Sequence, residues 1–178
     1  MAEQDIPIAA LHEHLVPPGL QSVGVDGMHC TLLHAIGLGR DDVDIDTLVK
    51  DVTSRVSTMS AFTLTFDRPA VGPFAIELSG WPGRPFTTLV DAVSQATART
   101  GVAFKPEPSR YPHMSTAYTT AGAEHVDPLT LKASLADIDR PLSATVLADR
   151  IHLVEQWHDG AHIRREPIAE VLLAGAAA

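Results

Sequence analysis

Gly27-Met28-His29-Cys30-Thr31-Leu32-Leu33-His34 is a stretch whose pattern occurs a second time in this chain, as Pro112-His113-Met114-Ser115-Thr116-Ala117-Tyr118. In each stretch a histidine is followed by one apolar residue and then by a hydroxyl residue. The two histidines are separated by 113 − 29 = 84 positions in a chain of 178 residues. The sequence therefore carries one short motif twice, once in each half.

Both motif stretches have the composition of β-strands. They are short and apolar, and turn-prone residues precede each of them, Val25-Asp26-Gly27 in the first case and 106–112 in the second. Side chains alternate between the two faces of a strand, so the histidine and the hydroxyl residue of each motif share a face. We expect these polar pairs to face a groove while the apolar neighbours enter a core; the pairs are His29 with Thr31 and His113 with Ser115.

Composition and charge narrow the classes of protein to which the chain can belong. Hydrophobic residues make up 45% of the sequence, as in an ordinary globular domain. The net charge of −9 argues against an extended nucleic-acid-binding surface, which needs clustered Lys and Arg, and leaves a small or short substrate open. The sequence has no G-x-G-x-x-G, P-loop or G-x-S-x-G motif.

The cysteine count and the apolar runs indicate the compartment. Cys30 is the only cysteine, which excludes an internal disulfide and gives no support to a cysteine-based zinc site. No apolar run reaches the ~18 residues of a membrane-spanning helix, and the acidic N-terminus does not resemble a signal peptide. We expect a cytoplasmic protein with no membrane partner; the oligomeric state is left open.

Apolar residues at helical spacing predict four helices, at 6–15, 45–56, 84–100 and 128–138. Asp44 or Asp46 is expected to cap the second helix, Gly101 to follow the third, and Pro128 to begin the fourth. Alternating or β-prone stretches predict further strands, at 20–25, 62–66, 74–78, 143–157 and 163–173. Pro69 is expected to stop the second of these strands, and the stretch 143–157 is expected to contain one bulge.

The order of these elements repeats. A motif strand, a helix and a pair of strands run from His29 to Leu78 and again from His113 to Leu173. Such a repeat predicts an α+β fold made of two duplicated lobes, with the motif strands side by side across a cleft. The two histidines would then face each other.

The paired motifs resemble those of the two-histidine (2H) phosphoesterase superfamily, and within it the 2′,5′ RNA ligase-like proteins. The hallmark of that family is a pair of H-x-[ST]-x motifs, which stand here as His29-Cys30-Thr31-Leu32 and His113-Met114-Ser115-Thr116. The flanking Tyr111-Pro112 and Ala117-Tyr118, and the late strand Arg150-Ile151-His152-Leu153-Val154, are also similar, so the resemblance covers most of the chain. The main departure is that the chain begins almost at its first helix, where family members usually have a preceding strand.

The resemblance implies a single bilobal domain over 1–178, with two pseudo-symmetric lobes, each an antiparallel sheet with helices on its outer side. It also implies a hydrolase of RNA processing, a phosphodiesterase that acts on 2′,3′-cyclic phosphates or 2′,5′-linked nucleotides. His29, Thr31, His113 and Ser115 would be the catalytic residues. No cofactor and no metal would be needed.

The chemistry of phosphodiester cleavage explains why two histidines are needed. One group must take a proton from the attacking oxygen and another must give one to the leaving oxygen, and the unperturbed pKa of an imidazole, ~6.5, suits both tasks. The hydroxyls of Thr31 and Ser115 can donate hydrogen bonds to the non-bridging oxygens. The sequence does not decide which histidine is the acid and which is the base, because two neighbouring imidazoles titrate as a pair.

Several other residues are weaker candidates for substrate binding. Arg110 and Lys105 can offer a cation from a loop, Tyr118 can stack on a base, and the last hairpin can bring polar or aromatic side chains to the cleft through His152, Gln156 and Trp157. We retain Arg110, Tyr118 and Trp157 as tentative binding residues. His34 is interpreted as structural, and His12 and His14 as part of a solvated face.

Three alternatives to this function remain at the level of the sequence. Some of the nine histidines could hold a metal ion for hydrolysis, although no H-x-x-x-H pattern or histidine–carboxylate cluster has ligand spacing. The same groove could bind a nucleotide without turnover. The scaffold could also serve specialised metabolism on a different phosphate ester.

Overall fold

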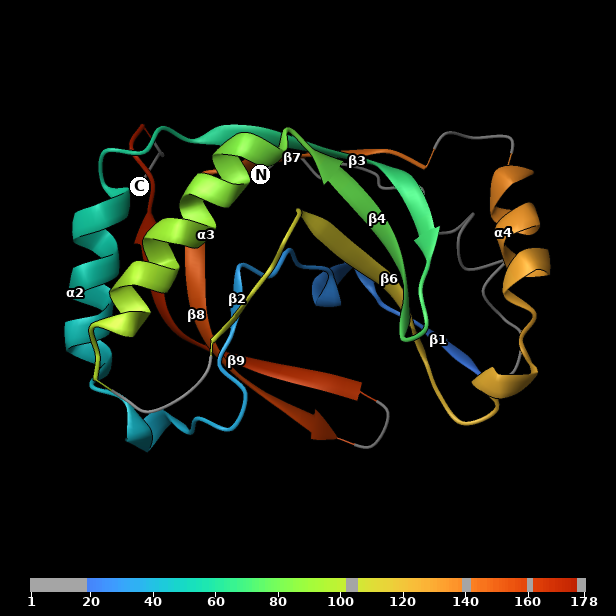
Figure 1. The fold of residues 1–178 in the computed structure, drawn as a ribbon, viewed down its shortest axis with the longest axis horizontal. Coiled ribbons are helices and arrows are strands. Elements are labelled where there is room, and N and C mark those ends of the chain that lie inside the picture. Colours follow the sequence, from blue (N-terminus) through green and yellow to red (C-terminus); the bar gives the residue numbers. More distant parts are fainter. Residues whose placement is uncertain (1–18, 102–105, 139–141, 160–161, 176–178) are drawn as a thin grey trace. The chain divides into compact units, whose positions relative to one another are not determined.

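The computed structural model describes residues 19–101, 106–138, 142–159 and 162–175. These residues form antiparallel sheets and helices, which confirms the α+β class (Figure 1). The predicted helix at 6–15 lies outside the described residues. No helix within the described ranges is long and apolar enough to cross a membrane.

The chain divides into two compact units, and each unit is assembled from three separate segments. The first unit contains 1–30, 65–81 and 113–146, and the second contains 31–64, 82–112 and 147–178. The expected lobes, from His29 to Leu78 and from His113 to Leu173, were therefore wrong in their boundaries. The reason is that sheet pairing joins strands that are distant in sequence, so the chain enters each unit three times.

The first unit is built on a five-stranded sheet in the order β1-β6-β4-β3-β7. Its strands are β1 (Leu20–Ser22), β6 (His113–Thr119), β4 (Ala75–Trp81), β3 (Phe62–Val71) and β7 (Ala144–Ala148). β6 pairs antiparallel with β1 on one side and with β4 on the other. The unit also contains helix α4 (Pro128–Ala136) and two short 3-10 helices, η1 (Val25–Gly27) and η3 (Ala123–His125).

The second unit packs two helices and a hairpin around its own core. The helices are α2 (Ile45–Val56) and α3 (Gly83–Ala98), and the hairpin pairs β8 (Arg150–Asp159) with β9 (His162–Leu172). Buried residues from both helices and from the end of the hairpin form one cluster, namely Val52, Val56, Leu89, Ala96, Val171 and Leu173. A short pair, β2 (Leu33–His34) with β5 (Glu107–Pro108), and the 3-10 helix η2 (Arg40–Asp42) complete the unit.

The helices follow local sequence signals. Asp44 is the N-cap of α2, because its carboxylate accepts a hydrogen bond from the Thr47 backbone N–H at 3.1 Å. Pro128 stands at the start of α4, where its missing N–H costs nothing, and Asp127 caps that helix. Hydrogen bonds from Thr47 and from Thr130 lower the pKa of Asp44 and of Asp127, respectively.

The strands depart from expectation at Pro69 and in the stretch 143–157. β3 continues through Pro69 to Val71, and the pairing with β4 runs on either side of the proline. A proline removes only one N–H donor from a strand, so it need not end the ladder. The stretch 143–157 is not one strand, because β7 ends at Ala148 and β8 begins at Arg150.

Register shifts interrupt three of the ladders between the described strands. The extra residue is Asp67 where β3 faces β4, Thr116 where β6 faces β4, and Ile168 where β9 faces β8. The bulge expected in 143–157 corresponds to the register shift in the β8–β9 hairpin. The extra residue, however, is Ile168 of β9 and not a residue of 143–157. A bulge changes which face the following side chains occupy, and the one at Thr116 lies inside the second motif.

Candidate functional site

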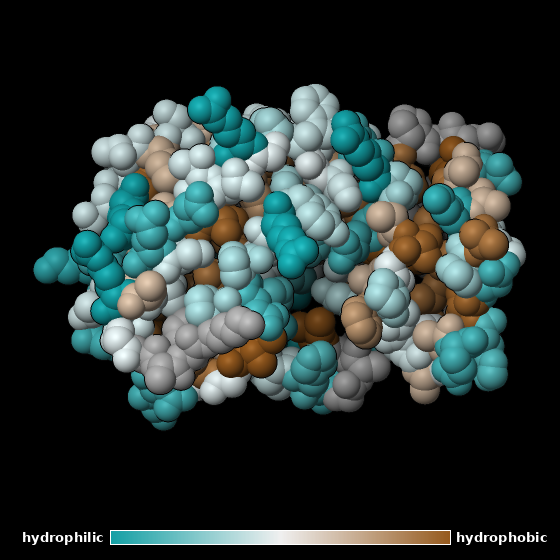
Figure 2. Space-filling model, in the orientation of Figure 1, coloured by the Kyte–Doolittle hydropathy of each residue, from teal (hydrophilic) through white to brown (hydrophobic). Residues whose placement is uncertain are grey.

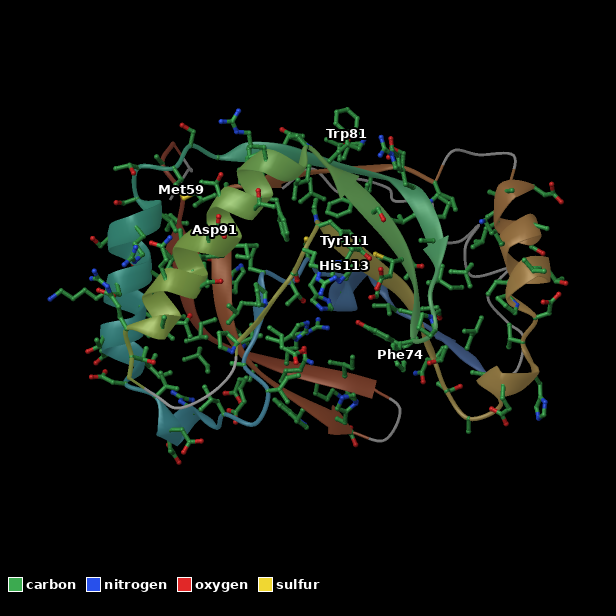
Figure 3. All side chains as sticks on the ribbon, in the orientation of Figure 1. Met59, Phe74, Trp81, Asp91, Tyr111 and His113 are labelled. Carbon is green, nitrogen blue, oxygen red and sulfur yellow. The ribbon has the colours of Figure 1, made fainter. Side chains whose placement is uncertain are left out.

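The second motif lies on β6, as predicted, and His113 and Ser115 point to the same face of the sheet. The register pairs His113 with Ser79 and Ser115 with Glu77 of β4, without interruption between them. Directly paired residues of antiparallel strands share a face, so Glu77 and Ser79 join the two motif side chains. His113 is half-buried and Ser115 is only 8% exposed. Figure 3 shows His113 at the start of β6.

The bulge at Thr116 brings Tyr118 onto this same face. Tyr118 pairs with Ala75 of β4, which is two residues from Glu77 and therefore on its side of the strand. Plain alternation from His113 would place Tyr118 on the opposite face, but Thr116 adds one residue to the strand and reverses that order. The Thr116 hydroxyl is fixed by a hydrogen bond to the Ile76 carbonyl at 3.0 Å.

The two faces of this part of the sheet differ sharply in polarity. On one face the register collects six side chains with polar groups, and we call them the motif face: Gln21, Glu77, Ser79, His113, Ser115 and Tyr118. The opposite face carries apolar residues that are 6% exposed or less, namely Ile76, Leu78, Met114 and Ala117. A buried apolar face fixes the strand register, and the register then fixes the polar face.

The first motif is not a strand, which corrects the prediction for His29, Cys30 and Thr31. The chain starts antiparallel to β6 in β1, and the Val23 backbone N–H still bonds to the Thr116 carbonyl at 2.8 Å. The 3-10 turn of η1 then takes residues 25–27 out of the ladder. Residues 28–31 have no regular secondary structure.

Cys30 nevertheless brings the first motif next to the second. The backbone of His113 lies close enough to the Cys30 thiol to affect its pKa, so the middle of one motif lies beside the beginning of the other within the first unit. Burial raises the pKa of the Cys30 thiol to about 11, and the neighbouring His113 backbone offsets part of that rise. Cys30 is therefore a neutral packing residue near neutral pH.

A local hydrogen bond orients the His29 ring. Nδ1 of His29 lies 3.0 Å from the carbonyl oxygen of Gly27, and a carbonyl can only accept, so Nδ1 carries a proton. In the neutral ring the lone pair then resides on Nε2. Nε2 is thus the atom at which His29 takes up or gives away a proton.

The two motif hydroxyls are available to a ligand. Within the described residues, neither the Thr31 nor the Ser115 side chain makes a hydrogen bond. Ser115 belongs to the first unit, whereas the boundary between the units follows Cys30, so Thr31 belongs to the second. The structure thus places His29, His113 and Ser115 in the first unit and Thr31 in the second.

The tentative binding residues of the second unit are less clearly grouped. Arg110 is exposed, and Lys105 lies outside the described residues. Trp157 is 46% exposed. It lies on the same face of β8 as Ile151, which packs against the core of that unit. His152 and Gln156 occupy the other face of the hairpin, so they cannot share a surface with Trp157.

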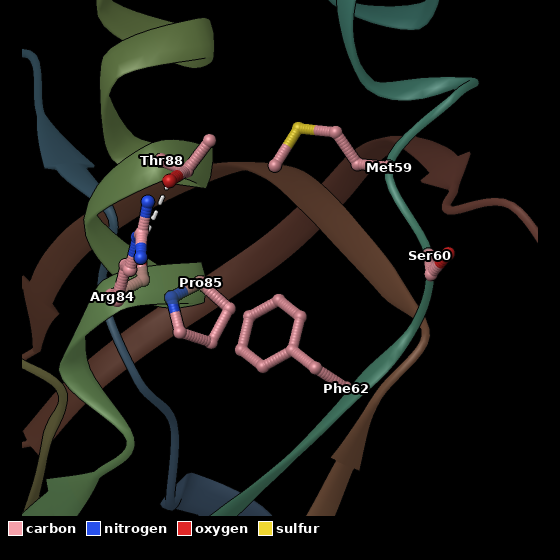
Figure 4. A pocket seen from close by; sticks show the side chains of 6 residues that line it. All are labelled: Met59, Ser60, Phe62, Arg84, Pro85 and Thr88. Carbon is pink, nitrogen blue, oxygen red and sulfur yellow. Dashed lines mark hydrogen bonds between the residues drawn. The ribbon is translucent and has the colours of Figure 1, made fainter.

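Two hollows in the described residues are lined by residues other than those of the motif face. In the second unit, a hollow of about 360 Å³ lies between the start of α3 and the segment before β3 (Figure 4), lined by Met59, Ser60, Phe62, Arg84, Pro85 and Thr88. In the first unit, a mainly apolar hollow of about 290 Å³ is lined by Leu20, Val71, Ile76 and Leu131 among others. None of the predicted site residues lines either hollow.

Among the described residues, no group of three or more His, Cys, Asp or Glu side chains is arranged to hold a metal ion. His34 is exposed at the end of β2. Figure 2 shows one side of the surface, on which polar side chains predominate and apolar ones form small separate patches.

Sequence reasoning missed Gln21, Glu77 and Ser79. The alternation of polar and apolar residues over 75–81 was visible, and it placed Glu77 and Ser79 on one face of a strand. The missing information was which strand lies beside that one. Only the register of β4 against β6 brings these residues next to His113 and Ser115.

Comparisons with known proteins bear on the fold. No family model matches the sequence, and no curated protein matches it. Among solved structures, E. coli LigT complexed with 3′-AMP is similar over 96% of this chain and 94% of that chain, with a TM-score of 0.62 and 18% identity. A structure described as a phosphoesterase covers 96% of this chain and 95% of its own, with a TM-score of 0.63 and 18% identity.

A third similar structure is TT0787 of Thermus thermophilus, which has a TM-score of 0.64 and 14% identity over 96% of this chain and 92% of that chain. LigT has also been solved with NADP+ and with ATP. At these identities the likeness establishes the fold. The chain has the scaffold of LigT and of a phosphoesterase, as the paired motifs predicted.

Proposed function

We propose that this chain, which has the fold of a phosphoesterase, is a metal-independent phosphodiesterase of the two-histidine type. The observation that carries the proposal is the pairing of β1 with β6 and the hydrogen bond from the Val23 N–H to the Thr116 carbonyl at 2.8 Å, which hold the segment leading into the first motif beside the second, although the two histidines are 113 − 29 = 84 positions apart. The fold alone would not support catalysis, since one fold serves many functions. The two histidines and two hydroxyl residues of the motifs, carried on this fold, supply that support.

The reaction requires a base on one side of the phosphorus and an acid on the other. One histidine of the pair, as a neutral imidazole, takes the proton of the attacking water or hydroxyl, and the other, as an imidazolium, protonates the departing ester oxygen. Because its Nδ1 is held by the Gly27 carbonyl, His29 exchanges its proton at Nε2. The O–P bond to the nucleophile forms, the P–O ester bond breaks, and each histidine ends in the protonation state of the other.

The hydroxyl residues stabilise the charge that develops on the phosphoryl oxygens. Ser115 lies on the face of His113, one pair of residues along β6, and its hydroxyl makes no hydrogen bond within the described residues. A donor that is already oriented in a half-buried site stabilises a developing negative charge more than water does. Thr31 has the corresponding place in the first motif.

The substrate class is a small nucleotide with a 2′,3′-cyclic phosphate or a 2′,5′ linkage. The family resemblance suggests this class, and the capture of 3′-AMP, ATP and NADP+ by LigT supports it. Tyr118 offers an aromatic ring on the motif face, where a base can stack. Arg110 and Trp157 stay weaker proposals for substrate contact.

The proposal is tested by hydrolysis of adenosine 2′,3′-cyclic phosphate and of a 2′,5′-linked adenosine dinucleotide in the presence of EDTA. We expect turnover with a bell-shaped pH dependence, because one imidazole must be neutral and the other protonated. His29→Ala and His113→Ala should each lower kcat/KM by about 10²- to 10⁴-fold. His125→Ala is the control, since that side chain is 83% exposed on η3.

Three results would contradict the proposal. The first is turnover that EDTA abolishes, which would indicate a metal-dependent hydrolase. The second is a rate that persists in both histidine variants. The third is tight binding of the nucleotides without any cleavage, which would indicate a binding module.

A further inference from the structure

Ser79 adds a second serine hydroxyl to the motif face. It lies on β4 and pairs directly with His113 of β6. The Cβ atoms of directly paired residues are about 4.5–5.5 Å apart, so the Ser79 hydroxyl lies close to the base of the His113 side chain. The repeated motif says nothing about this position, because β4 carries neither copy of it.

The hydroxyl of Ser79 has unused hydrogen-bonding capacity. It belongs to a half-buried side chain, and within the described residues it makes no hydrogen bond. Two threonine hydroxyls of β6 differ in this respect, because Thr116 donates to the Ile76 carbonyl at 3.0 Å and Thr119 to the Phe74 carbonyl at 3.2 Å. Those two hydroxyls serve the fold, whereas the hydroxyl of Ser79 is available to a ligand on the motif face.

The spacing of the two serines suits a single phosphoryl group. Ser79 and Ser115 are diagonal neighbours across β4 and β6, since Ser115 is two residues beyond His113. The Cβ atoms of such neighbours are about 7–8 Å apart. A phosphoryl group between them can accept one hydrogen bond of about 2.7 Å from each hydroxyl, on two different oxygens. His113 is next to both serines, so its ring can reach the same group.

On the basis of the proposed function, we propose that Ser79 is a further catalytic residue, which donates a hydrogen bond to one non-bridging phosphoryl oxygen while Ser115 donates to the other. Negative charge grows on these oxygens as the nucleophile attacks, and a donor that is already in place stabilises it. The Ser79 hydroxyl keeps its proton throughout. Its loss therefore lowers kcat more than it raises KM.

A role of Ser79 in holding the His113 ring is a different case. Within the described residues the Ser79 hydroxyl makes no hydrogen bond, so it makes none to that ring. A residue that acts through the ring would also change the pKa of His113, and its removal would shift one limb of the pH profile of activity. Loss of a hydrogen bond to the phosphoryl group instead lowers the rate by the same factor across the profile.

The test compares adenosine 2′,3′-cyclic phosphate with the two diastereomers of its phosphorothioate. In each diastereomer sulfur replaces a different non-bridging oxygen, and sulfur is a weak hydrogen-bond acceptor. We would measure kcat, KM and the pH profile for the wild type, Ser79→Ala and Ser22→Ala. Ser22→Ala is the matched control, because Ser22 pairs with Ala117 and so lies on the opposite face of the same sheet.

We expect Ser79→Ala to lower kcat for the cyclic phosphate by about 10²-fold at every pH, with a much smaller change in KM. Ser22→Ala should leave both unchanged. In the wild type, sulfur should slow both diastereomers. In Ser79→Ala the slowing should largely disappear for one diastereomer, because no hydrogen bond from Ser79 remains to be lost there, and should persist for the other, which depends on Ser115.

The proposal is overturned if Ser79→Ala has the kcat of the wild type, if it reduces the sulfur effect of neither diastereomer, or if it shifts the pH profile. These results contradict only the role of Ser79 when His29→Ala and His113→Ala still abolish turnover. Absence of turnover in the wild type overturns the proposed function and the role of Ser79 together.

Discussion

The two copies of the motif have the same residue pattern but are held by different kinds of backbone. The copy at His113 lies in the middle of a sheet, with β1 and β4 on either side of β6. The copy at His29 follows a 3-10 turn and has no regular secondary structure. In the second copy alternation orients the side chains, whereas in the first a hydrogen bond to Gly27 orients the ring.

This difference shows that a functional pattern need not have one local structure. What the two copies share is a polar histidine with a small or flexible neighbour that enters the protein interior. Met114 is 6% exposed on the apolar face of β6, and Cys30 is half-buried against the backbone of His113. If the comparison is correct, substitutions at equivalent positions should have unequal effects on stability.

The largest stability effect is expected at the apolar position of the second copy. Met114→Ala should lower the free energy of unfolding by about 2–4 kcal/mol, because it leaves a cavity in a buried face. Cys30→Ala, at the equivalent position of the first copy, should cost about 1 kcal/mol, since only one sulfur is removed. Urea denaturation of the two variants measures both values, and equal losses would show that the two copies are embedded alike.

The next effect concerns the pH dependence of stability. The pKa of Cys30 is raised from 9.0 to about 11 in the folded chain by burial, so the folded state favours the neutral thiol. The contribution of this group is therefore complete below pH 9 and is lost as the pH rises through 11, a change of about 3 kcal/mol. Urea denaturation at a series of pH values should show this decline in the wild type but not in Cys30→Ala.

The same shift makes the thiol slow to react. Thiolate is the nucleophile, so Cys30 should be alkylated far more slowly in the folded chain than in urea at the same pH. Equal rates would mean that the thiol is not buried beside His113.

The smallest effect is expected at the bulge. Thr116→Val removes the buried hydrogen bond to the Ile76 carbonyl and should cost about 1 kcal/mol. Thr119→Val is the control, because its hydroxyl bonds to the Phe74 carbonyl at 3.2 Å in an exposed position. Thermal denaturation of both variants compares the two bonds, and a larger loss from Thr119→Val would indicate that the bulge is held by other contacts.

The sequence by itself determined what local chemistry can specify. The repeated histidine and hydroxyl pattern predicted the pair of motifs and, through the family resemblance, the fold that the solved structures confirm. A capping aspartate, expected at 44 or 46 and found at Asp44, and the proline at 128 located two helices, because caps act on neighbouring backbone groups. The strand that begins at His113 was predicted from the short apolar stretch 113–118 and the turn-prone residues before it.

The tertiary structure decided everything that depends on which segments meet. The turn of η1 displaced the first motif from its ladder, and the extra residue at Thr116 moved Tyr118 to the face of His113. Glu77 came beside Ser115 only through the pairing of β4 with β6. Register is a property of two strands together, set by packing of their common buried face, and a single stretch of sequence carries only half of that information.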